Sequence, residues 1–481
     1  MFGPTRIVAK KLASLGNRRR LRFEPLEDRC LLATLVVDIN DPAANLPGDH
    51  LYSQIQEAVV AASPGDQIKV YPGTYQPVVV TTDNLTIRAA NVNSLPVIDA
   101  TFAFAGLQLI ANGTTIRGLV VEHAFADGFL VAGTGNTLQG NISRLNGFDG
   151  FHLDFSHQNK LIGNSALFNG DQGFYLGSSN ENQLKDNQAT DNNWDGFALI
   201  DSDSNRLSGN VSHGNASGFA IGQSSDNNIF TGNETAGNDF FGMVFFGNSN
   251  GNTLKENLAA SNGWEGFVIA EGSFNVLKGN VASDNQRDGF VLNVNSHHNT
   301  LIGNTSTGNA SGFALGNFST SNTLTGNVAS DNDFFGFVLF ENSHGNTLRG
   351  NVASHNAAAG FVLYLSNANI LIGNKAIGNG DEGFVLNQSN ESLLQGNEAR
   401  ENGLDGILLF FSHRNSLIHN ESEENDGNGF QLLGSDENKL FDNEAEDNAG
   451  WGFYVDEVLS NLFDGNESEG NILGGANFPG I

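Results

Sequence analysis

The sequence predicts an all-β solenoid, one elongated domain in which about 23 residues form each coil. The main observation is an asparagine that recurs as an anchor, with 23 or 24 residues from one anchor to the next. The anchors are Asn141, Asn164, Asn187, Asn210, Asn233, Asn257, Asn280, Asn304, Asn327, Asn351, Asn374, Asn397, Asn420, Asn443 and Asn466. Because so constant a period requires each coil to stack directly on the previous one, the repeat determines the architecture.

Two short apolar runs in every coil predict the strands. An apolar residue lies three positions before each anchor, as at Leu138. The second run reads Gly-Phe-x-Leu, as at residues 150–153, and its Phe and Leu point to the same, inward side. The 36 phenylalanines, against 3 tryptophans, fit a repeated interior position. We therefore expect three short strands per coil and three parallel sheets.

Asparagine also recurs five residues after the anchor and five before it, where Ser392 is the one exception. Asparagine tolerates the left-handed backbone conformation that a sharp corner requires. Its amide can also bond to the asparagine in the coils above and below. We interpret these positions as corner ladders and not as a binding surface. The glycine before Phe is interpreted as corner backbone, and a recurrent serine, as at Ser156, as a turn ladder.

The residues before the regular repeats predict a cap. Residues 52–62 place Ile55, Ala58, Val59 and Ala62 on one face of a short helix that would cover the first coil. The segment from Ile55 to Tyr75 closely resembles the opening of the pectate-lyase-like, right-handed parallel β-helix superfamily. This resemblance implies a right-handed helix and leaves the activity open, because enzymes and non-enzymes share the fold.

We expect residues 35–481 to form this single domain. Its parts are the N-terminal cap and first strands (35–75), irregular first coils (76–135), regular coils (136–471) and a C-terminal tail (472–481). So short a tail leaves the last coil nearly uncovered, and end-to-end self-association is therefore one expectation.

Residues 1–34 are predicted to be an export leader. Eight of the 23 basic residues lie there. Pro25, Leu26, Glu27, Arg29 and the pair 31–32 resemble the LEPR-XLL leader of large surface or exported proteins of planctomycete-type bacteria. The alternative is a basic tail without a targeting role. Export to the cell surface or extracellular space is the expectation, with the periplasm as a further location.

Composition excludes several classes of partner. The formal net charge is −30, and residues 35–481 hold 50 acids and 15 bases, which argues against nucleic acid. The sequence contains no run of about 20 apolar residues, so no membrane span is predicted. Cys30 is the single cysteine, so neither an intramolecular disulfide nor a cysteine-based metal site is expected.

The superfamily resemblance raises three enzymatic activities, which are pectate-type elimination, glycoside hydrolysis and mannuronan epimerisation. The D-P-H-E, N-T-D, G-H-G and R-I-K strings of such enzymes are absent. One coil, residues 285–298, resembles the epimerase segment N-x-R-H-G-F…S-H, which makes Arg287, Asp288, His297 and His298 the catalytic candidates. Asp288 stands where that segment has histidine, and no tyrosine lies in the adjacent coils. No coil between Asn141 and Asn466 is longer than its neighbours by more than one residue, so we expect a flat face without groove walls.

Acids that precede the Gly-Phe corner are the candidate metal ligands. They include Asp127, Asp149, Asp195, Glu265 and Asp288, and stacked carboxylates suit calcium. Calcium is the one cofactor considered. The eleven histidines show no metal-like spacing. The ladder residues also resemble the NosD-type β-helix, a family linked to copper-enzyme maturation.

The sequence thus predicts an exported, non-catalytic β-helix with a structural role and a carbohydrate-binding face toward a polysaccharide or the cell-surface matrix. Two alternatives stay open. One is an enzyme acting on polysaccharide, either a uronan lyase or a mannuronan-type epimerase. The other is a NosD-like periplasmic protein of copper-enzyme maturation.

Overall fold

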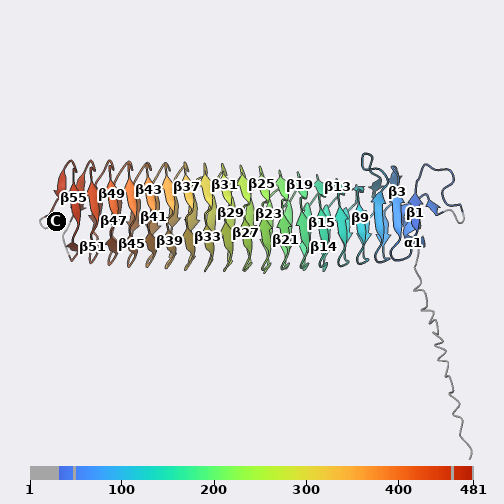
Figure 1. Cartoon of the computed structure of the whole chain (residues 1–481), viewed down its shortest axis with the longest axis horizontal. Coiled ribbons are helices and arrows are strands. Elements are labelled where there is room, and N and C mark those ends of the chain that lie inside the picture. The colour runs from blue at the N-terminus through green and yellow to red at the C-terminus, as the bar shows by residue number, and fades with distance from the viewer. Residues whose placement is uncertain (1–31, 47–49, 457–459, 479–481) are drawn as a thin grey trace, which may run out of the picture.

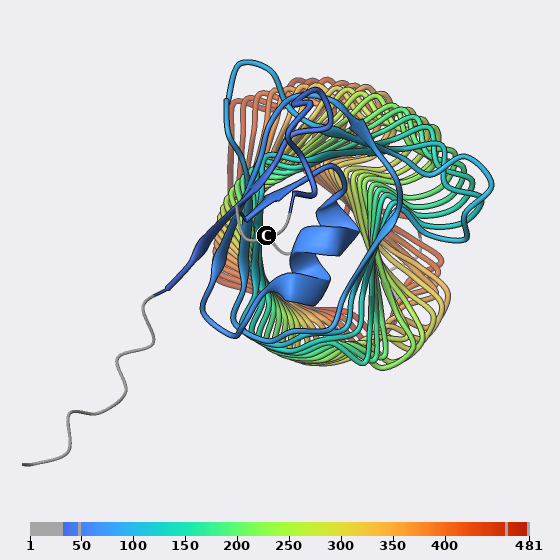
Figure 2. The same cartoon turned by 90° about the vertical axis from the view of Figure 1, so that its right-hand side faces the viewer.

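The computed structural model describes residues 32–46, 50–456 and 460–478, and in it the chain forms a straight parallel β-helix (Figure 1). The predicted leader, except its last three residues, lies outside the described residues. Each regular coil adds one strand to each of three sheets, and the end-on view shows successive coils stacked with a progressive offset from one to the next (Figure 2). The predicted all-β solenoid with three parallel sheets and about 23 residues per coil is confirmed. No described helix is long and apolar enough to cross a membrane.

Sheet A contains 20 strands among the described residues, and each is parallel to its neighbours. They are β1 Thr34–Val37, β2 Leu51–Tyr52, β3 Gln67–Val70, β6 Thr86–Ala89, β9 Thr115–Arg117, β12 Thr137–Gln139, β15 Lys160–Ile162, β18 Gln183–Lys185, β21 Arg206–Ser208, β24 Ile229–Thr231, β27 Thr253–Lys255, β30 Val276–Lys278, β33 Thr300–Ile302, β36 Thr323–Thr325, β39 Thr347–Arg349, β42 Ile370–Ile372, β45 Leu393–Gln395, β48 Ser416–Ile418, β51 Lys439–Phe441 and β54 Leu462–Asp464. The central residue of each regular strand points into the core.

Sheet B follows sheet A after a two-residue corner and contains 18 described strands. They are β4 Thr74–Tyr75, β7 Val97–Asp99, β10 Val120–Glu122, β13 Ile142–Arg144, β16 Ser165–Leu167, β19 Gln188–Thr190, β22 Val211–His213, β25 Glu234–Ala236, β28 Leu258–Ala260, β31 Val281–Ser283, β34 Thr305–Thr307, β37 Val328–Ser330, β40 Val352–Ser354, β43 Lys375–Ile377, β46 Glu398–Arg400, β49 Glu421–Glu423, β52 Glu444–Glu446 and β55 Glu467–Glu469. Small Ala, Ser or Thr side chains fill its inner face in the regular coils.

Sheet C also contains 18 described strands, and it carries the Phe-x-Leu run. They are β5 Val78–Val80, β8 Leu107–Leu109, β11 Phe129–Val131, β14 Phe151–Asp154, β17 Phe174–Gly177, β20 Phe197–Ile200, β23 Phe219–Gly222, β26 Met243–Phe245, β29 Phe267–Ala270, β32 Phe290–Asn293, β35 Phe313–Leu315, β38 Phe337–Leu339, β41 Phe361–Tyr364, β44 Phe384–Asn387, β47 Ile407–Phe410, β50 Phe430–Leu433, β53 Trp451–Val455 and β56 Gly474–Ala476. Most of its strands in the regular coils have four residues, whereas those of sheets A and B have three.

A single helix, α1 (Ile55–Ala61), lies across the N-terminal end of the solenoid (Figure 2). Its buried residues Ile55, Ala58 and Val59 face the first coils. Glu57 accepts a hydrogen bond from the Gln54 backbone N–H at 2.9 Å, which satisfies a free donor at the helix start. The helix therefore covers the apolar end of the core, as the sequence predicts.

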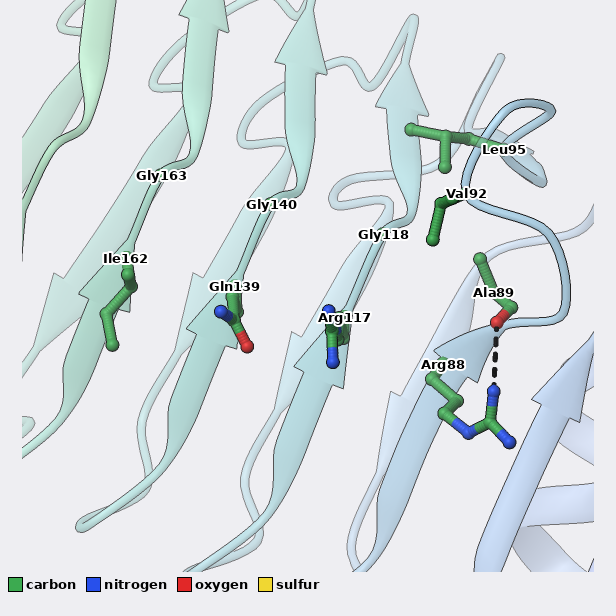
Figure 3. Close-up of a pocket in the computed structure, with 10 residues that line it drawn as sticks. All are labelled: Arg88, Ala89, Val92, Leu95, Arg117, Gly118, Gln139, Gly140, Ile162 and Gly163. Carbon is green, nitrogen blue, oxygen red and sulfur yellow. Dashed lines mark hydrogen bonds between the residues drawn. The ribbon is translucent and has the colours of Figure 1, made fainter.

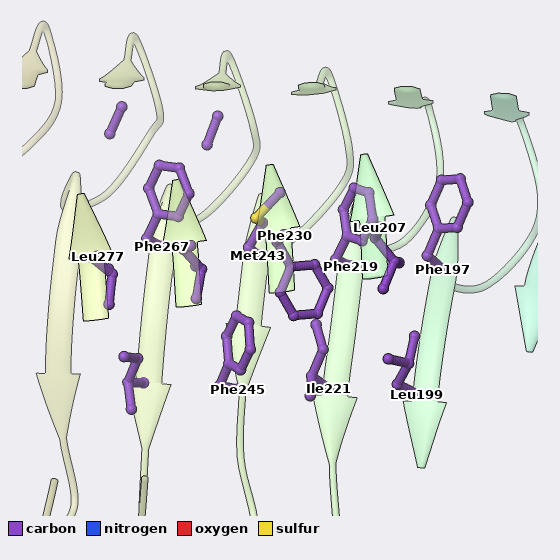
Figure 4. Packing of buried hydrophobic residues seen from close by; sticks show 14 of the residues in the cluster. Phe197, Leu199, Leu207, Phe219, Ile221, Phe230, Met243, Phe245, Phe267 and Leu277 are labelled. Atoms are coloured by element: carbon purple, nitrogen blue, oxygen red, sulfur yellow. The ribbon is translucent and has the colours of Figure 1, made fainter. Parts of the chain in front are cut away.

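Stacked phenylalanines form the core of sheet C. Ring centroids of Phe313, Phe337 and Phe361 lie 4.7 and 4.8 Å apart, and their rings are nearly parallel. The stack is broken at Met243, where Phe230 and Phe245 fill the space with edge-on contacts (Figure 4). The predicted inward position of the phenylalanine in the Gly-Phe-x-Leu run is confirmed. Its ring stacks on the ring in the next coil at the spacing between neighbouring strands.

The asparagine ladders are buried hydrogen-bond chains. Asn304 Oδ1 accepts from both the backbone N–H and Nδ2 of Asn280, at 2.9 and 3.0 Å. Asn280 Nδ2 also donates to the Leu254 carbonyl at 3.0 Å. One expectation is corrected, because the ladder asparagines do not adopt the left-handed conformation. The residue before each anchor asparagine does, as at Gly279 (φ 64°) and Glu256 (φ 55°).

Candidate functional site

A groove runs along the outer face of sheet C in the N-terminal half of the rod. It consists of two hollows of about 580 and 390 Å³ that share Gln172 and Tyr175. The first is lined by Phe104, Asp127, Phe148, Asp149, His152, Asp154 and Asp171, and the second by Trp194, Asp195, Ala198, Ile200, Ser217, Ala220, Phe241, Val244 and Phe246. We call this surface the sheet C groove. The expected flat face is therefore corrected, because side chains, not long loops, form the walls.

The groove follows from the strand period. The residue between Phe and Leu points outward, and in-register pairing places His152 beside Tyr175 and Tyr175 beside Ala198. The residue before each corner glycine forms one wall, with Asp149 in one coil and Asp195 two coils on. Since every coil repeats this arrangement, the groove changes its chemistry along the rod according to which side chain each coil supplies.

The first hollow is polar. Asp149 Oδ2 lies 2.7 Å from His152 Nδ1, and Asp127 Oδ1 lies 3.7 Å from the same nitrogen. A ligand atom from each of these three residues lies within 4.8 Å of the others. The Tyr175 ring lies against the His152 ring, with centroids 4.8 Å apart. Both aspartates are nearly inaccessible to solvent, whereas the imidazole is partly exposed to the groove.

Negative charge is in excess in this hollow. Burial raises the pKa of Asp127, and burial together with the carboxylates of Asp149 and Asp195 raises the pKa of Asp171 to about 6. Burial acts to lower the pKa of His152, but the hydrogen bond to Asp149 and the surrounding carboxylates outweigh it and raise that pKa. No lysine or arginine lines either hollow. The cluster is thus suited to a proton, a cation or hydroxyl donors.

The second hollow is apolar. Ala220, Val244 and Val268 point outward, yet they are at most 8% exposed because neighbouring side chains, including Phe241 and Phe246, pack over them. Trp194, which is 59% exposed, forms the edge of this hollow. The wall continues beyond it, where the Trp264 ring contacts the Phe241 ring at 5.0 Å. Aromatic faces and carboxylates therefore lie side by side in one groove.

The structure brings together only part of the predicted metal set. Asp127 and Asp149 lie in adjacent coils, and Asp127 Oδ1 accepts from the Asp149 backbone N–H at 3.1 Å. Gln172 separates them from Asp195, which accepts from the Ser217 backbone N–H at 3.1 Å. Each of these aspartates thus bonds to the backbone of the next coil.

Glu265 and Asp288 lie in adjacent coils farther along the same column. Arg287 Nη1 lies 3.6 Å from Glu265 Oε1, and its guanidinium stacks on the Trp264 ring at 4.4 Å. Asp288 Oδ1 accepts from the Ser311 backbone N–H at 2.9 Å. Arg287 and Asp288 therefore belong to the wall of sheet C and have structural partners there.

The two candidate histidines lie at the other end of strand β32. His297 Nδ1 is 2.9 Å from Thr320 Oγ1, and the His298 ring stacks on Phe274 with centroids 5.2 Å apart. His298 is the left-handed residue before a ladder asparagine, with φ 55°. The structure thus places the four catalytic candidates as two separate pairs.

Sequence reasoning missed His152, Asp171 and Tyr175 as site residues. The signal was present, because Asp149 follows Asp127 by about one coil and Tyr175 follows His152 by 23 residues. In a solenoid such residues become neighbours. Metal-ligand motifs of a few residues do not include them, because these residues are separated along the chain by about one coil.

The fold and its repeat define a right-handed β-helix protein. Residues 203–329 and 236–377 match the family model for right handed beta helix regions. A longer match covers residues 62–258 and 336–476 and is to the family described as periplasmic copper-binding protein (NosD). The chain belongs to the NosD family. No curated protein matches the sequence.

Several solved structures are similar to this chain. A double mutant of the periplasmic alginate epimerase AlgG is 15% identical, with 79% of this chain and 78% of that chain covered and a TM-score of 0.37. The A-module of the Azotobacter vinelandii mannuronan C-5 epimerase AlgE4 is 14% identical, with 85% and 94% covered and a TM-score of 0.38. Pectate lyase Pel9A is 16% identical, with 68% and 78% covered and a TM-score of 0.34. Neither substrate nor activity follows from such remote likenesses.

The copper in the family's description can be compared with the residues present. Asp127, Asp149 and His152 offer two carboxylate oxygens and one imidazole nitrogen, a donor set that suits Cu(II) or another divalent transition ion. Cu(I) prefers thiolate or thioether ligands, and among the described residues the one methionine, Met243, is buried in the core. The cluster therefore fits the oxidised ion.

Proposed function

We propose that this chain is an exported, non-catalytic β-helix protein that binds polysaccharide along the sheet C groove. The observation that carries the proposal is that aromatic rings and hydrogen-bonding groups line the same hollow, with Trp194, Tyr175 and Phe241 as the rings and Asp195 and Gln172 as the hydrogen-bonding groups. Sugars present both apolar faces, which stack on aromatic rings, and hydroxyls, which bond to carboxylates and amides. An elongated groove made of two adjoining hollows suits a chain polymer.

The charge of the groove favours a neutral polysaccharide. Asp127, Asp149 and Asp171 lie in it without a lysine or arginine among the lining residues. Like charges repel and a uronate chain would meet a net charge of −30, so anionic polymers are disfavoured unless a cation intervenes. Hydroxyl groups, in contrast, are good donors to these carboxylates.

An exported location agrees with such a ligand. The resemblance of residues 25–32 to an export leader and the periplasmic description of the NosD family both support it. Polysaccharides of the cell wall and surface are then within reach of the protein.

Removal of one aromatic wall residue tests the proposal. The full chain is screened on an array of neutral and acidic glycans, and the best ligand is titrated calorimetrically. We expect Trp194→Ala or Phe241→Ala to weaken binding about tenfold or more, because buried aromatic contacts dominate binding energies. Phe334→Ala is the matched control, since Phe334 is 57% exposed and lies outside the groove. Binding to no glycan, or equal loss in the control, would contradict the proposal.

Incubation of the full chain with the glycans it binds tests the enzymatic alternative. Asp171, with a pKa near 6, beside the Asp149 carboxylate is a combination that glycoside cleavage can use. New reducing ends, or the absorbance of an unsaturated uronate product, would show turnover. Such products would overturn the non-catalytic part of the proposal and leave groove binding in place.

Copper binding is the second candidate function, and the Asp127–Asp149–His152 cluster favours it. We expect the full chain to bind one Cu(II), and Asp127→Asn or His152→Gln to weaken this binding about tenfold or more. Binding should fall as the pH drops through the raised pKa of His152, because a protonated imidazole cannot ligate a metal. Electron paramagnetic resonance should show nitrogen coupling that His152→Gln removes.

His157→Gln is the control for this experiment. His157 Nδ1 accepts from the Asn180 backbone N–H at 3.0 Å, outside the cluster. If His152→Gln leaves the copper affinity and spectrum unchanged, the cluster is not the copper site.

A further inference from the structure

A column of cations lies on the outer face of sheet A, near the N-terminal end. Lys69, Arg88 and Arg117 occupy the same outward position on strands β3, β6 and β9, and they are paired in register. Neighbouring strands are about 4.8 Å apart, so three basic side chains leave the backbone one after another at that spacing. Like charges directly opposite on neighbouring strands are destabilising.

Acidic side chains do not neutralise this column. Farther along the same face Lys185 pairs with Asp186 at 3.9 Å and Lys255 with Glu256 at 3.2 Å. None of the ion pairs among the described residues includes Lys69, Arg88 or Arg117. Arg88 instead donates to the neutral Gln67 Oε1 at 3.2 Å. In a chain with 53 acids and 23 bases, cations without carboxylate partners leave donors available for an external anion.

A cavity of about 440 Å³ adjoins Arg88 and Arg117. The loop between β6 and β7 carries Val92 and Leu95 beside the strands and forms an apolar wall (Figure 3). Ile162, two strands beyond Arg117, continues the apolar lining (Figure 3). The corner residues at this edge are glycines, and a Cβ at Gly140 or Gly163 would meet no atom within 4 Å, so the space beside them is open.

We propose that this cavity binds an amphipathic anion. Its acidic group, a carboxylate, sulfonate or phosphate, lies between the guanidinium groups of Arg88 and Arg117, and Lys69 adds to the positive field. Its apolar part lies against Val92, Leu95 and Ile162. Arginine suits this role because its planar fork donates two hydrogen bonds to one oxyanion.

This site is separate from the sheet C groove in both place and chemistry. It lies on another sheet, and its lining shares no residue with the groove. The groove has acids and neither lysine nor arginine, whereas this cavity has two arginines and no acid among its lining residues. Binding here is therefore independent of the proposed polysaccharide function.

The test uses anilinonaphthalene sulfonate as an amphipathic anion, inorganic sulfate as the anion alone, and phosphatidylglycerol vesicles as the lipid form. We expect the full chain to bind one sulfonate at this site, at least about tenfold more tightly than sulfate, and to bind it more weakly as salt rises. The double variant Arg88→Gln/Arg117→Gln should weaken binding about tenfold or more. The variant Val92→Ser/Leu95→Ser should weaken sulfonate binding and leave sulfate binding unchanged.

Arg349→Gln is the matched control, because Arg349 ends strand β39 at the position that Arg117 has in β9 and lies far from the loop and cavity. Circular dichroism verifies that each variant is folded. Sulfonate binding that the double variant leaves unchanged, or that Arg349→Gln weakens equally, overturns the proposal. Vesicle binding that is lost in the double variant assigns the anion to a lipid, and its absence beside sulfonate binding assigns it to a soluble molecule.

Discussion

Asn285→Ala is expected to lower the free energy of unfolding by about 4 kcal/mol. Two buried backbone groups, the Asn262 N–H and the Ala259 carbonyl, lose their bond to the Asn285 amide, at about 1–3 kcal/mol each. Asn285 Oδ1 accepts from the backbone N–H and Nδ2 of Asn262, at 3.0 and 2.9 Å. Its Nδ2 donates to the Ala259 carbonyl at 3.0 Å and to Asn309 Oδ1 at 2.9 Å. Alanine removes all four bonds at a corner where Asn285 is only 3% exposed, so the groups that lose them are buried.

Gln286→Ala is the matched control in the same coil. Gln286 is exposed, and its side chain makes no hydrogen bond among the described residues. Urea unfolding followed by circular dichroism compares the two variants, and we expect the control to change stability by less than about 0.5 kcal/mol. Equal midpoints for both variants would mean that the ladder amides contribute nothing beyond their backbone.

The period of the sequence was sufficient for the fold because register in a solenoid depends on coil length alone. Once neighbouring anchors are 23 or 24 residues apart, Asn280 must lie beside Asn304 and Phe290 beside Phe313. Alternation within Gly-Phe-x-Leu then decides which side chains enter the core. No long-range information beyond the period is needed for these features.

The left-handed backbone conformation at the corners was predicted for the wrong residue. Asparagine tolerates a left-handed φ, so the ladder residue itself was an obvious choice. The glycine that precedes many anchors, as at Gly163 and Gly303, was the better signal, and both have a φ of 60°. Where aspartate or glutamate replaces it, as at Asp186, the left-handed conformation persists. The ladder hydrogen bonds hold the corner in place, so stacking overrides the local preference.

The sites were harder to predict than the fold, for two physical reasons. The groove walls are made of side chains, such as Trp194 and Phe241, which do not lengthen the coils. The absence of long loops therefore could not predict whether a groove is present. The column of Lys69, Arg88 and Arg117 lies in the first coils, which differ in length, so its register does not follow the 23-residue period.

Phe337→Ala is expected to lower the free energy of unfolding by about 3–5 kcal/mol, the usual loss when a buried aromatic residue is truncated. Phe337 is 0% exposed, and its ring stacks between Phe313 and Phe361 at centroid distances of 4.7 and 4.8 Å. The cavity cannot close by movement of one coil, because hydrogen bonds to both neighbouring coils fix the strand. The loss should therefore lie in the upper part of that range.

Phe334→Ala provides the internal control, three residues away on the same coil. Phe334 is 57% exposed, so alanine should change the stability by less than about 0.5 kcal/mol. Calorimetry and urea unfolding should both show that Phe337→Ala is less stable than Phe334→Ala. Because a solenoid is coupled mainly through neighbouring coils, Phe337→Ala should also broaden the transition and let the two halves of the rod unfold at different midpoints. A single transition that shifts without broadening would show that the stack couples the whole rod, and a variant as stable as Phe334→Ala would show that the phenylalanine column contributes no core energy.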